Sequence, residues 1–208
     1  IVMNSTGVGE VVESSIDDYP IGTKVLTQTG WQEYSLQKPQ NLTKLREGID
    51  PSLYLGPLGI NGLTAYFGLL EVGQPESGET VMVSAAAGSV GHMVGQIAKI
   101  KGCKVVGICG NDDKCSKLKD ELNFDAAVND KDSNFRQNLK EATPDGVDIY
   151  FDNVAGDILD TVLKNLALYA RIPLSGLLAQ YNEKGSRLPG PKNFDQLLMK
   201  RATITGFF

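Results

Sequence analysis

Short apolar runs alternate with amphipathic segments over the second part of the chain. Val81, Met82 and Val83 form an apolar run without helical spacing, which is typical of a strand buried on both faces of a parallel sheet. The strands predicted in this way cover residues 80–85, 104–109, 126–129, 147–152, 170–176 and 202–208. The helices predicted between them cover residues 90–101, 113–122, 134–142, 157–167 and 193–200.

This regular alternation predicts an α/β fold, a doubly wound parallel sheet of six strands with right-handed connections. Ligands of such sheets bind at the carboxyl ends of the strands. Pro173 falls inside the fifth predicted strand, where it removes a donor from the ladder of hydrogen bonds. We therefore expect a bulge or irregular pairing at Pro173.

Residues 7–36 show a different pattern, in which short strands are separated by Asp, Pro and Gly turn residues. The predicted strands cover residues 9–13, 23–27 and 31–36. Three strands cannot bury a face alone, so we expect the tail of an antiparallel barrel whose beginning is missing. A glycine-rich bend over residues 53–70 leads into the following helix, and we expect two domains, residues 1–50 and 51–208.

A glycine-rich turn follows the first strand of the predicted parallel sheet. Gly88 permits a tight reversal, Gly91 lets the backbone approach a pyrophosphate, and Gly95 lets the next helix pack near its strand. The N–H groups of residues 89–92 would point at anionic oxygens, with the helix dipole adding attraction. Ala86 stands where the usual motif has its first glycine, so a turn that serves packing alone remains an alternative.

The composition is that of an ordinary globular protein, with 41% hydrophobic and 22% charged residues among 208. A net charge of -5, with no basic block longer than Lys200-Arg201, argues against a nucleic-acid or anionic membrane partner. No uninterrupted apolar stretch approaches the roughly 20 residues of a membrane span. Cys103, Cys109 and Cys115 fit no zinc spacing, and we expect reduced thiols and a cytoplasmic location.

Five segments of the chain resemble, in order, the medium-chain dehydrogenase/reductase superfamily. They are LGPLGINGLTAYFG at residues 55–68, AAAGSVG at 85–91, GICGNDDK at 107–114, GVDIYFDNVAG at 146–156 and SGLLAQYN at 175–182. The similarity is greatest to the branch of prostaglandin reductases, leukotriene B4 12-hydroxydehydrogenases and alkenal double-bond reductases. The resemblance implies a Rossmann-type sheet preceded by the tail of a GroES-like barrel, in a chain that lacks both ends of the family's sequence.

The resemblance also implies NADPH as the cofactor, with NAD less favoured. The residues that it places against the cofactor are Gly88, Ser89, Val90, Gly91, His92, Lys114, Asn153, Ser175, Gly176, Leu177, Leu178, Ala179, Gln180, Tyr181, Phe207 and Phe208. Lys114 would offset a 2′-phosphate, although an ordinary exposed lysine is the alternative.

Three acidic residues complicate the choice of cofactor. Asp112 and Asp113 suit the 2′-hydroxyl of NAD, and Asp130 stands where relatives usually have a tyrosine, so it would repel a 2′-phosphate unless Lys131 or Lys114 screens it. Ala155 likewise replaces a glycine that relatives usually have. For Asn153, a strand-to-helix cap is the alternative to cofactor binding.

The activity that the resemblance implies is reduction of the C=C bond of an α,β-unsaturated ketone or aldehyde. Tyr181 would donate a hydrogen bond to the enolate oxygen, or pack its ring under the cofactor. We expect no metal, because His92 is the one histidine of the sequence and falls in the glycine turn. A quinone oxidoreductase and a non-catalytic nucleotide-binding remnant remain alternatives, the partner expected is a small enone or alkenal, and a homodimer is compatible with the family.

Overall fold

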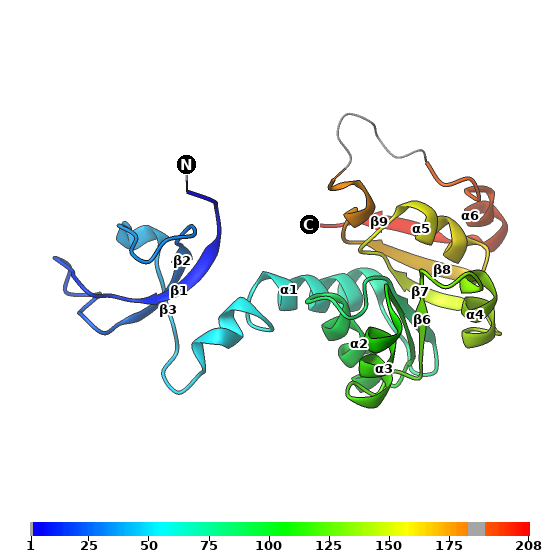
Figure 1. Ribbon diagram of the computed structural model, residues 1–208, viewed down its shortest axis with the longest axis horizontal. Helices are drawn as coiled ribbons and strands as arrows, with labels where there is room; N and C mark the ends of the chain where they lie inside the picture. Colours follow the sequence, from blue (N-terminus) through cyan, green and yellow to red (C-terminus); the bar gives the residue numbers. More distant parts are fainter. Residues whose placement is uncertain (1, 183–189) are drawn as a thin grey trace. The chain divides into compact units, whose positions relative to one another are not determined.

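The computed structural model describes residues 2–182 and 190–208. The chain divides into two compact units, Ile1–Leu63 and Thr64–Phe208, each with a sheet of its own (Figure 1). Among the described residues, no helix has the length and apolar character needed to cross a bilayer.

The first unit contains a small antiparallel sheet in the order β1-β2-β3, formed by Thr6–Glu10, Lys24–Gln28 and Thr43–Lys44. Short 3-10 helices cover Pro39–Asn41 (η1) and Pro51–Leu55 (η2). The strand predicted over residues 31–36 is wrong. Gly30, at φ +66°, turns the chain away from β2, and Trp31 and Tyr34 lie exposed in a bend, while the third strand forms at Thr43 instead.

The second unit contains the predicted parallel sheet of six strands within the described residues. Its order is β6 (Ala126–Asn129), β5 (Lys104–Cys109), β4 (Thr80–Val83), β7 (Val147–Phe151), β8 (Leu166–Leu174) and β9 (Thr203–Gly206). Following the chain, β5 and β6 are added on one side of β4, and β7, β8 and β9 are then added on its other side. The strand order thus reverses between β4 and β7, which is where ligands of open α/β sheets bind.

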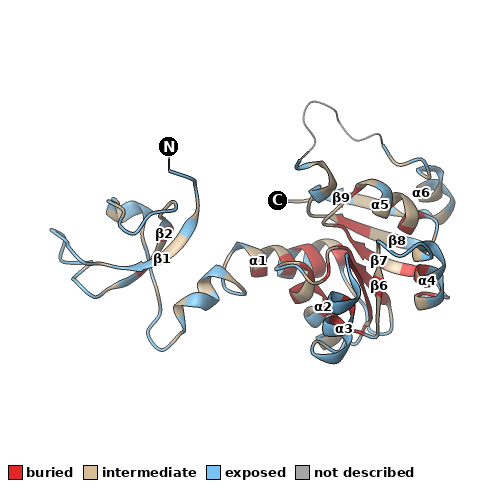
Figure 2. Ribbon diagram, in the orientation of Figure 1, coloured by how far each residue is buried: buried red, intermediate tan, exposed pale blue. Residues whose placement is uncertain are grey.

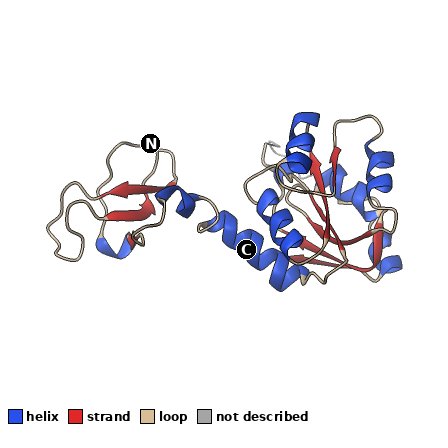
Figure 3. Cartoon of the chain, turned by 90° about the horizontal axis from the view of Figure 1, so that it is seen from below, coloured by secondary structure: helices blue, strands red, loops and turns tan. Residues whose placement is uncertain are grey.

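Helices cover both faces of this sheet (Figure 3). One face carries α1 (Ile60–Phe67), the π-helical turn η3 (Gly68–Gly73), α2 (Gly91–Ile100) and α3 (Asp112–Asp120), and the other carries α4 (Phe135–Ala142), α5 (Gly156–Leu163) and α6 (Asp195–Lys200). Buried residues, red in Figure 2, follow the strands of this sheet. Val81 and Val83 belong to the first core and Met82 to the second, and all three are fully buried. The apolar run therefore reflects a strand covered on both sides, as predicted.

The strand β8 departs most from its predicted form. It begins at Leu166, inside the predicted helix over residues 157–167, and its register with β7 shifts between Leu166 and Arg171, where Tyr169 has φ +63°. The irregularity expected at Pro173 is not there. Pro173 stays in register with Thr205 of β9, and its carbonyl accepts the N–H of Asp152 at 2.9 Å, so the proline serves the sheet as an acceptor.

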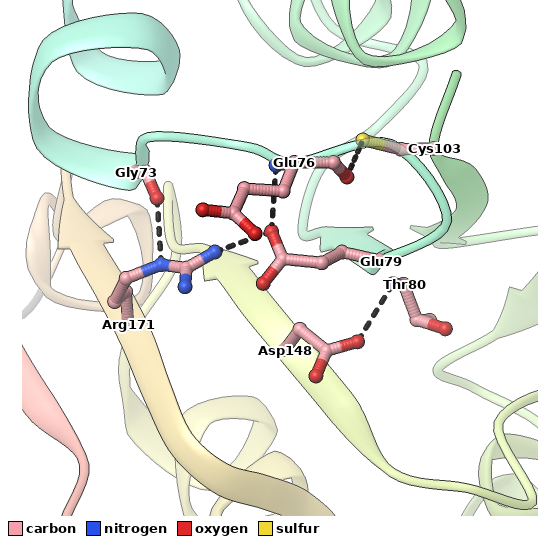
Figure 4. Close-up of polar contacts among 7 residues, drawn as sticks. All are labelled: Gly73, Glu76, Glu79, Thr80, Cys103, Asp148 and Arg171. Atoms are coloured by element: carbon pink, nitrogen blue, oxygen red, sulfur yellow. Dashed lines mark hydrogen bonds and ion pairs between the residues drawn. The ribbon is translucent and has the colours of Figure 1, made fainter. Parts of the chain in front are cut away.

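A cluster of polar contacts fastens η3 to the sheet on the side where β4 begins (Figure 4). The Arg171 guanidinium donates to the carbonyl of Gly73 at 2.7 Å and pairs with the carboxylate of Glu79 at 2.5 Å. The same carboxylate accepts the N–H of Glu76 at 2.8 Å. Because the Arg171 and Glu79 side chains are 27% and 20% exposed, removing one of them leaves a partly buried charge without its partner.

The α5 helix begins from a backbone conformation that suits glycine. Ala155, directly before the helix, has φ +62° and ψ -150°, a region that other residues rarely occupy. Its N–H donates to the Asp152 side chain at 2.9 Å, which holds the conformation in place. The alanine is therefore strained.

Replacing Arg171 by methionine should lower the free energy of unfolding by about 2 kcal/mol, because Glu79 and the Gly73 carbonyl lose their partner. Chemical denaturation monitored by circular dichroism measures this change. Lys117→Ala is the control, since its 3.9 Å pair with Glu121 lies in solvent and should contribute less than about 0.5 kcal/mol. Equal effects of the two changes would contradict the assignment.

Replacing Ala155 by glycine should raise the free energy of unfolding by about 0.5–1 kcal/mol. The relief of strain exceeds the loss of one buried methyl group and the added entropy of the unfolded chain. The same exchange at Ala98, buried within α2, should lower it by about 1 kcal/mol or more. A loss of stability in both variants, measured by the same denaturation, would show that Ala155 is unstrained.

Candidate functional site

The turn between β4 and α2 reverses at a residue other than the predicted one. The left-handed conformation belongs to Ala85, at φ +47°, whereas Gly88 has no positive φ. The N–H of Gly88 closes the turn by donating to the Ala85 carbonyl at 2.9 Å. Gly88 thus lies within the tight turn, where a Cβ atom would be 3.1 Å from the Ala85 carbonyl oxygen, but the left-handed backbone of the reversal belongs to Ala85.

The glycines at 91 and 95 are needed for close packing. A Cβ atom on Gly91 would lie 2.7 Å from the Cα of Ala86, so this position has no room for a side chain. A Cβ atom on Gly95 would collide with the ring of Phe124, which follows α3. Gly95 thus makes room for Phe124, and its predicted role in packing the helix near its strand stays a prediction.

Three successive backbone amides at the start of α2 lack partners. Across the part of the chain that the structure describes, no hydrogen bond forms from the N–H of Ser89, Val90 or Gly91. The N–H of His92, in contrast, donates to the Gly88 carbonyl at 3.1 Å. Unpartnered amides at a helix N-terminus are suited to an anion, so this turn fits a pyrophosphate.

The His92 side chain adds no positive charge to this turn at neutral pH. Partial burial, with a contribution from Lys117, lowers the pKa of its imidazole below the usual value of 6.5. The ring nitrogen Nδ1 shares a hydrogen bond with Gln96 at 3.0 Å. Attraction of an anion to the turn therefore comes from backbone dipoles.

A cleft of about 680 Å³ extends from this turn along the carboxyl ends of the strands. Of the predicted cofactor residues, Gly88, Lys114, Leu178 and Ala179 line it. Leu177 and Gln180 line a second, smaller hollow beside α5, together with Ala179. Apolar residues of α4 and α5, Phe135 and Ile158 among them, also line the cleft. They were not predicted, because an apolar helix residue that lines a cleft has the same sequence pattern as one that faces the core.

The far end of the cleft is lined by charged side chains from α3 and from the segment that follows β6. Lys114 lies exposed in the first turn of α3, where its N–H donates to the Asn111 side chain at 2.9 Å. Asp112 accepts the side-chain amide of Asn129 at 2.8 Å. Asp130 lines the cleft with Lys131, and the two side chains form an ion pair of 2.9 Å.

At the reversal of strand order, the carboxyl group of Asp152 gathers four donors. Its Oδ1 accepts the hydroxyls of Ser84 at 3.0 Å and Tyr150 at 2.9 Å, and the N–H groups of Val154 and Ala155 at 2.9 Å each. Its Oδ2 is buried and has no partner among the described residues. Burial raises the pKa of this carboxyl group, and burial together with Asp152 raises the pKa of Tyr150.

Asn153 is fixed to the end of β4. Its backbone N–H donates to the Ser84 hydroxyl at 2.9 Å, and its Nδ2 donates to the Ser84 carbonyl at 2.8 Å. The residue directly before α5 is Ala155, and no side chain caps this helix. Asn153 therefore does not cap α5 and is held at the strand end, where its position beside a nicotinamide stays a prediction.

Residues 175–181 are fastened to the segment between β7 and α5. The N–H groups of Ser175 and Gly176 donate to the Asp152 carbonyl, at 2.8 and 3.2 Å. A short 3-10 helix, Leu178–Gln180 (η4), follows, and its first two N–H groups donate to the carbonyls of Asn153 and Val154. These hydrogen bonds place the loop after β8 beside the carboxyl end of β7, next to the end of β4.

The Tyr181 hydroxyl turns back over Gly176. A Cβ atom on Gly176 would lie 3.4 Å from that hydroxyl and 2.9 Å from the Asn153 carbonyl oxygen. The Tyr181 side chain remains 67% exposed. Tyr181 lines neither hollow, and its role as a donor to a substrate oxygen stays a prediction.

The end of β9 lies beside β8. The Phe207 N–H donates to the Leu174 carbonyl at 3.4 Å, and its ring packs edge-on against Phe151 with centroids 5.9 Å apart. Phe208 is fully exposed. The predicted contact of this backbone with a carboxamide stays a prediction.

The described residues do not fit a zinc ion. They contain no group of three or more His, Cys, Asp or Glu side chains arranged to hold a metal. Cys103, Cys109 and Cys115 are free and buried, and Cys109 shares a hydrogen bond of 2.7 Å with Cys115. Burial and this hydrogen bond raise the pKa of the Cys109 thiol, so it disfavours the thiolate that binds metal.

Comparison with known proteins supports a common origin along the whole chain. Residues 89–208 match the family model described as zinc-binding dehydrogenase, and residues 1–45 match the model described as N-terminal domain of oxidoreductase. Prostaglandin reductase 1 of Oryctolagus cuniculus is 44% identical over 96% of this chain and 58% of its own length. The NADP(+)-dependent 2-alkenal reductase of Nicotiana tabacum is 46% identical over 97% of this chain and 59% of its own length.

The crystal structure of CurA from Vibrio vulnificus in complex with NADPH has a similar fold. It superimposes with a TM-score of 0.90 at 42% identity, covering 99% of this chain and 62% of CurA. The chain thus spans about 60% of the length of the relatives that it matches. With a family model matched from the β4–α2 turn to the last strand, the chain belongs to the zinc-binding dehydrogenase family of the medium-chain dehydrogenase/reductase superfamily.

Proposed function

We propose that this chain binds NADPH and takes part in reducing the C=C bond of α,β-unsaturated ketones or aldehydes. The observation that carries the proposal is the row of unpartnered amides at Ser89, Val90 and Gly91, at one end of the β4–α2 turn whose Gly88 shares a cleft with Lys114. Amides at a helix N-terminus bind a diphosphate, and a lysine ammonium binds a further phosphate. The NADP-dependent alkenal reductase and the NADPH complex of CurA support the same cofactor.

In this proposal, the segments at the carboxyl ends of the strands bind different parts of NADPH. The β4–α2 turn binds the diphosphate, Lys114 binds the 2′-phosphate, and Asn153 with residues 175–181 borders the nicotinamide. The chemistry that NADPH supplies when bound is transfer of a hydride to the β-carbon of the substrate. Tyr181 donates a hydrogen bond to the carbonyl oxygen of the substrate, where negative charge gathers during the reaction.

We assign residues 1–50 to the substrate domain and residues 51–208 to the nucleotide domain, a boundary that lies 13 residues before the one between the two compact units, after Leu63. The match of residues 1–45 to the N-terminal domain of oxidoreductases supports this division. A small enone or alkenal is the proposed substrate, and reaction without a metal is part of the proposal. The three free thiols support a reducing, cytoplasmic environment, and a homodimer is compatible with it.

Replacing Lys114 by glutamate should weaken NADPH binding by about tenfold or more and leave NADH binding nearly unchanged, because NADH lacks the 2′-phosphate. Isothermal titration calorimetry with both nucleotides measures the two affinities. Lys119→Glu, at the exposed end of the same helix and outside the cleft, is the matched control. If both nucleotides weaken equally, Lys114 does not read the 2′-phosphate.

Replacing Tyr181 by phenylalanine should lower the rate of alkenal reduction by about 100-fold while NADPH affinity stays the same, since one donor to the developing oxyanion is lost. The decrease in absorbance of the reduced nicotinamide follows the reaction. Tyr169→Phe, on β8 with its hydroxyl bonded to Arg201, should react like the wild type.

The same assay separates the proposal from its alternatives. Consumption of NADPH with a quinone and not with an alkenal would favour a quinone oxidoreductase. Binding of NADPH without consumption in either case would leave a nucleotide-binding role alone.

A further inference from the structure

The Asp130 carboxylate lies over the end of β5. The Asp130 N–H donates to the Cys109 carbonyl at 3.0 Å, which places the residue directly beside the last position of that strand. A Cβ atom on Gly110 would lie 3.5 Å from Asp130 Oδ1, and the Asp130 side chain is 12% exposed. The carboxylate is thus held in the cleft, and solvent does little to screen it.

Two lysines share this part of the cleft with Asp130. Lys131 pairs with Asp130 Oδ2 at 2.9 Å while its own side chain remains 74% exposed, and Lys114 lines the same cleft from α3. Asp112 is already bonded to Asn129, and neither Asp112 nor Asp113 lines the cleft. Asp157 of α5 also lines the cleft, but Asp130 is the acidic lining residue that is paired with Lys131 beside the end of β5.

We propose that the Asp130–Lys131 pair sets the selectivity of this chain at the 2′ position of the adenosine ribose. Asp130 repels a 2′-phosphate and can accept a hydrogen bond from a 2′-hydroxyl. Lys131 neutralises Asp130, so that Lys114 can still attract the phosphate. This inference rests on the proposed nucleotide site and adds two residues that weaken and restore its preference for NADPH.

The physical basis is that a 2′-phosphate carries nearly two negative charges at neutral pH, whereas a hydroxyl carries none. Removing Asp130 leaves two lysines around the phosphate, and removing Lys131 leaves one lysine and an unpaired carboxylate. A like charge placed against a ligand is a standard means of rejecting it. The two substitutions should therefore change affinity for the phosphate in opposite directions.

The experiment titrates the whole chain with adenosine 2′,5′-bisphosphate and with 5′-AMP by isothermal titration calorimetry. Asp130→Asn should bind the bisphosphate about tenfold more tightly, and Lys131→Gln about tenfold more weakly. Affinity for 5′-AMP should change by less than about twofold in either variant. Asp120→Asn, at the exposed end of α3, is the control for loss of a carboxylate outside the cleft.

The outcomes separate this inference from the proposed function. Suppose that the wild type binds NADPH and the bisphosphate. If both variants then bind the bisphosphate as the wild type does, or if their affinities for the bisphosphate and for 5′-AMP change equally, the pair is a surface ion pair and this inference is wrong. If the wild type binds no nucleotide, the proposed function fails and this inference fails with it. Thermal melting of each variant shows that a change in affinity is not a loss of folded protein.

Discussion

The carboxyl group of Asp152 connects the strands at which the strand order of the parallel sheet reverses. Its side chain takes donors from Ser84, directly after β4, and from Tyr150 within β7, while its backbone carbonyl takes the amides that follow β8. Burying a carboxyl group costs free energy unless it is well supplied with hydrogen bonds, and four donors meet one of its oxygens. Three strand ends are thereby fixed relative to one another at the place where the reaction is proposed to occur.

The other features of this region follow from that connection. Asn153 donates twice to Ser84, from its backbone N–H to the hydroxyl and from its side-chain amide to the carbonyl, and Asp152 holds that hydroxyl in position. Ala155 keeps a glycine-like backbone because its N–H is one of the four donors. The loop after β8 packs so closely that Gly176 has no room for a side chain, which in turn brings the Tyr181 hydroxyl over the strand ends. Rigidity at this point is consistent with a site that must hold two reactants in register.

Much of the sheet could be predicted from the sequence, because strands buried on both faces leave uninterrupted apolar runs such as Val81–Val83. The early start of β8 could not, since Leu166 to Ala170 carry no signal that separates a bulged strand from the end of a helix. The third strand of the first unit was misplaced because the aromatic and apolar residues Trp31, Tyr34 and Leu36 follow a turn glycine as a strand would, yet they form no strand among the described residues. The turn after β4 could be predicted from its glycines, but the residue that carries its left-handed backbone is an alanine, and propensity favours glycine there. The role of Asp152 left no trace in the sequence, because a buried carboxyl group is recognised only by the donors that the fold brings to it.

Attraction to an anion has a different source at the β4–α2 turn than at the far end of the cleft. At the β4–α2 turn, attraction is exerted at contact range by amide dipoles, which mobile ions screen weakly. At the opposite end, Lys114 and Lys131 act through exposed formal charges, whose reach contracts from about 10 Å to about 3 Å between 0.1 and 1 M ionic strength. High salt would therefore weaken contacts to the adenosine end of a bound dinucleotide more than contacts to its diphosphate. Selectivity between NADPH and NADH would then be lost at a lower salt concentration than binding itself.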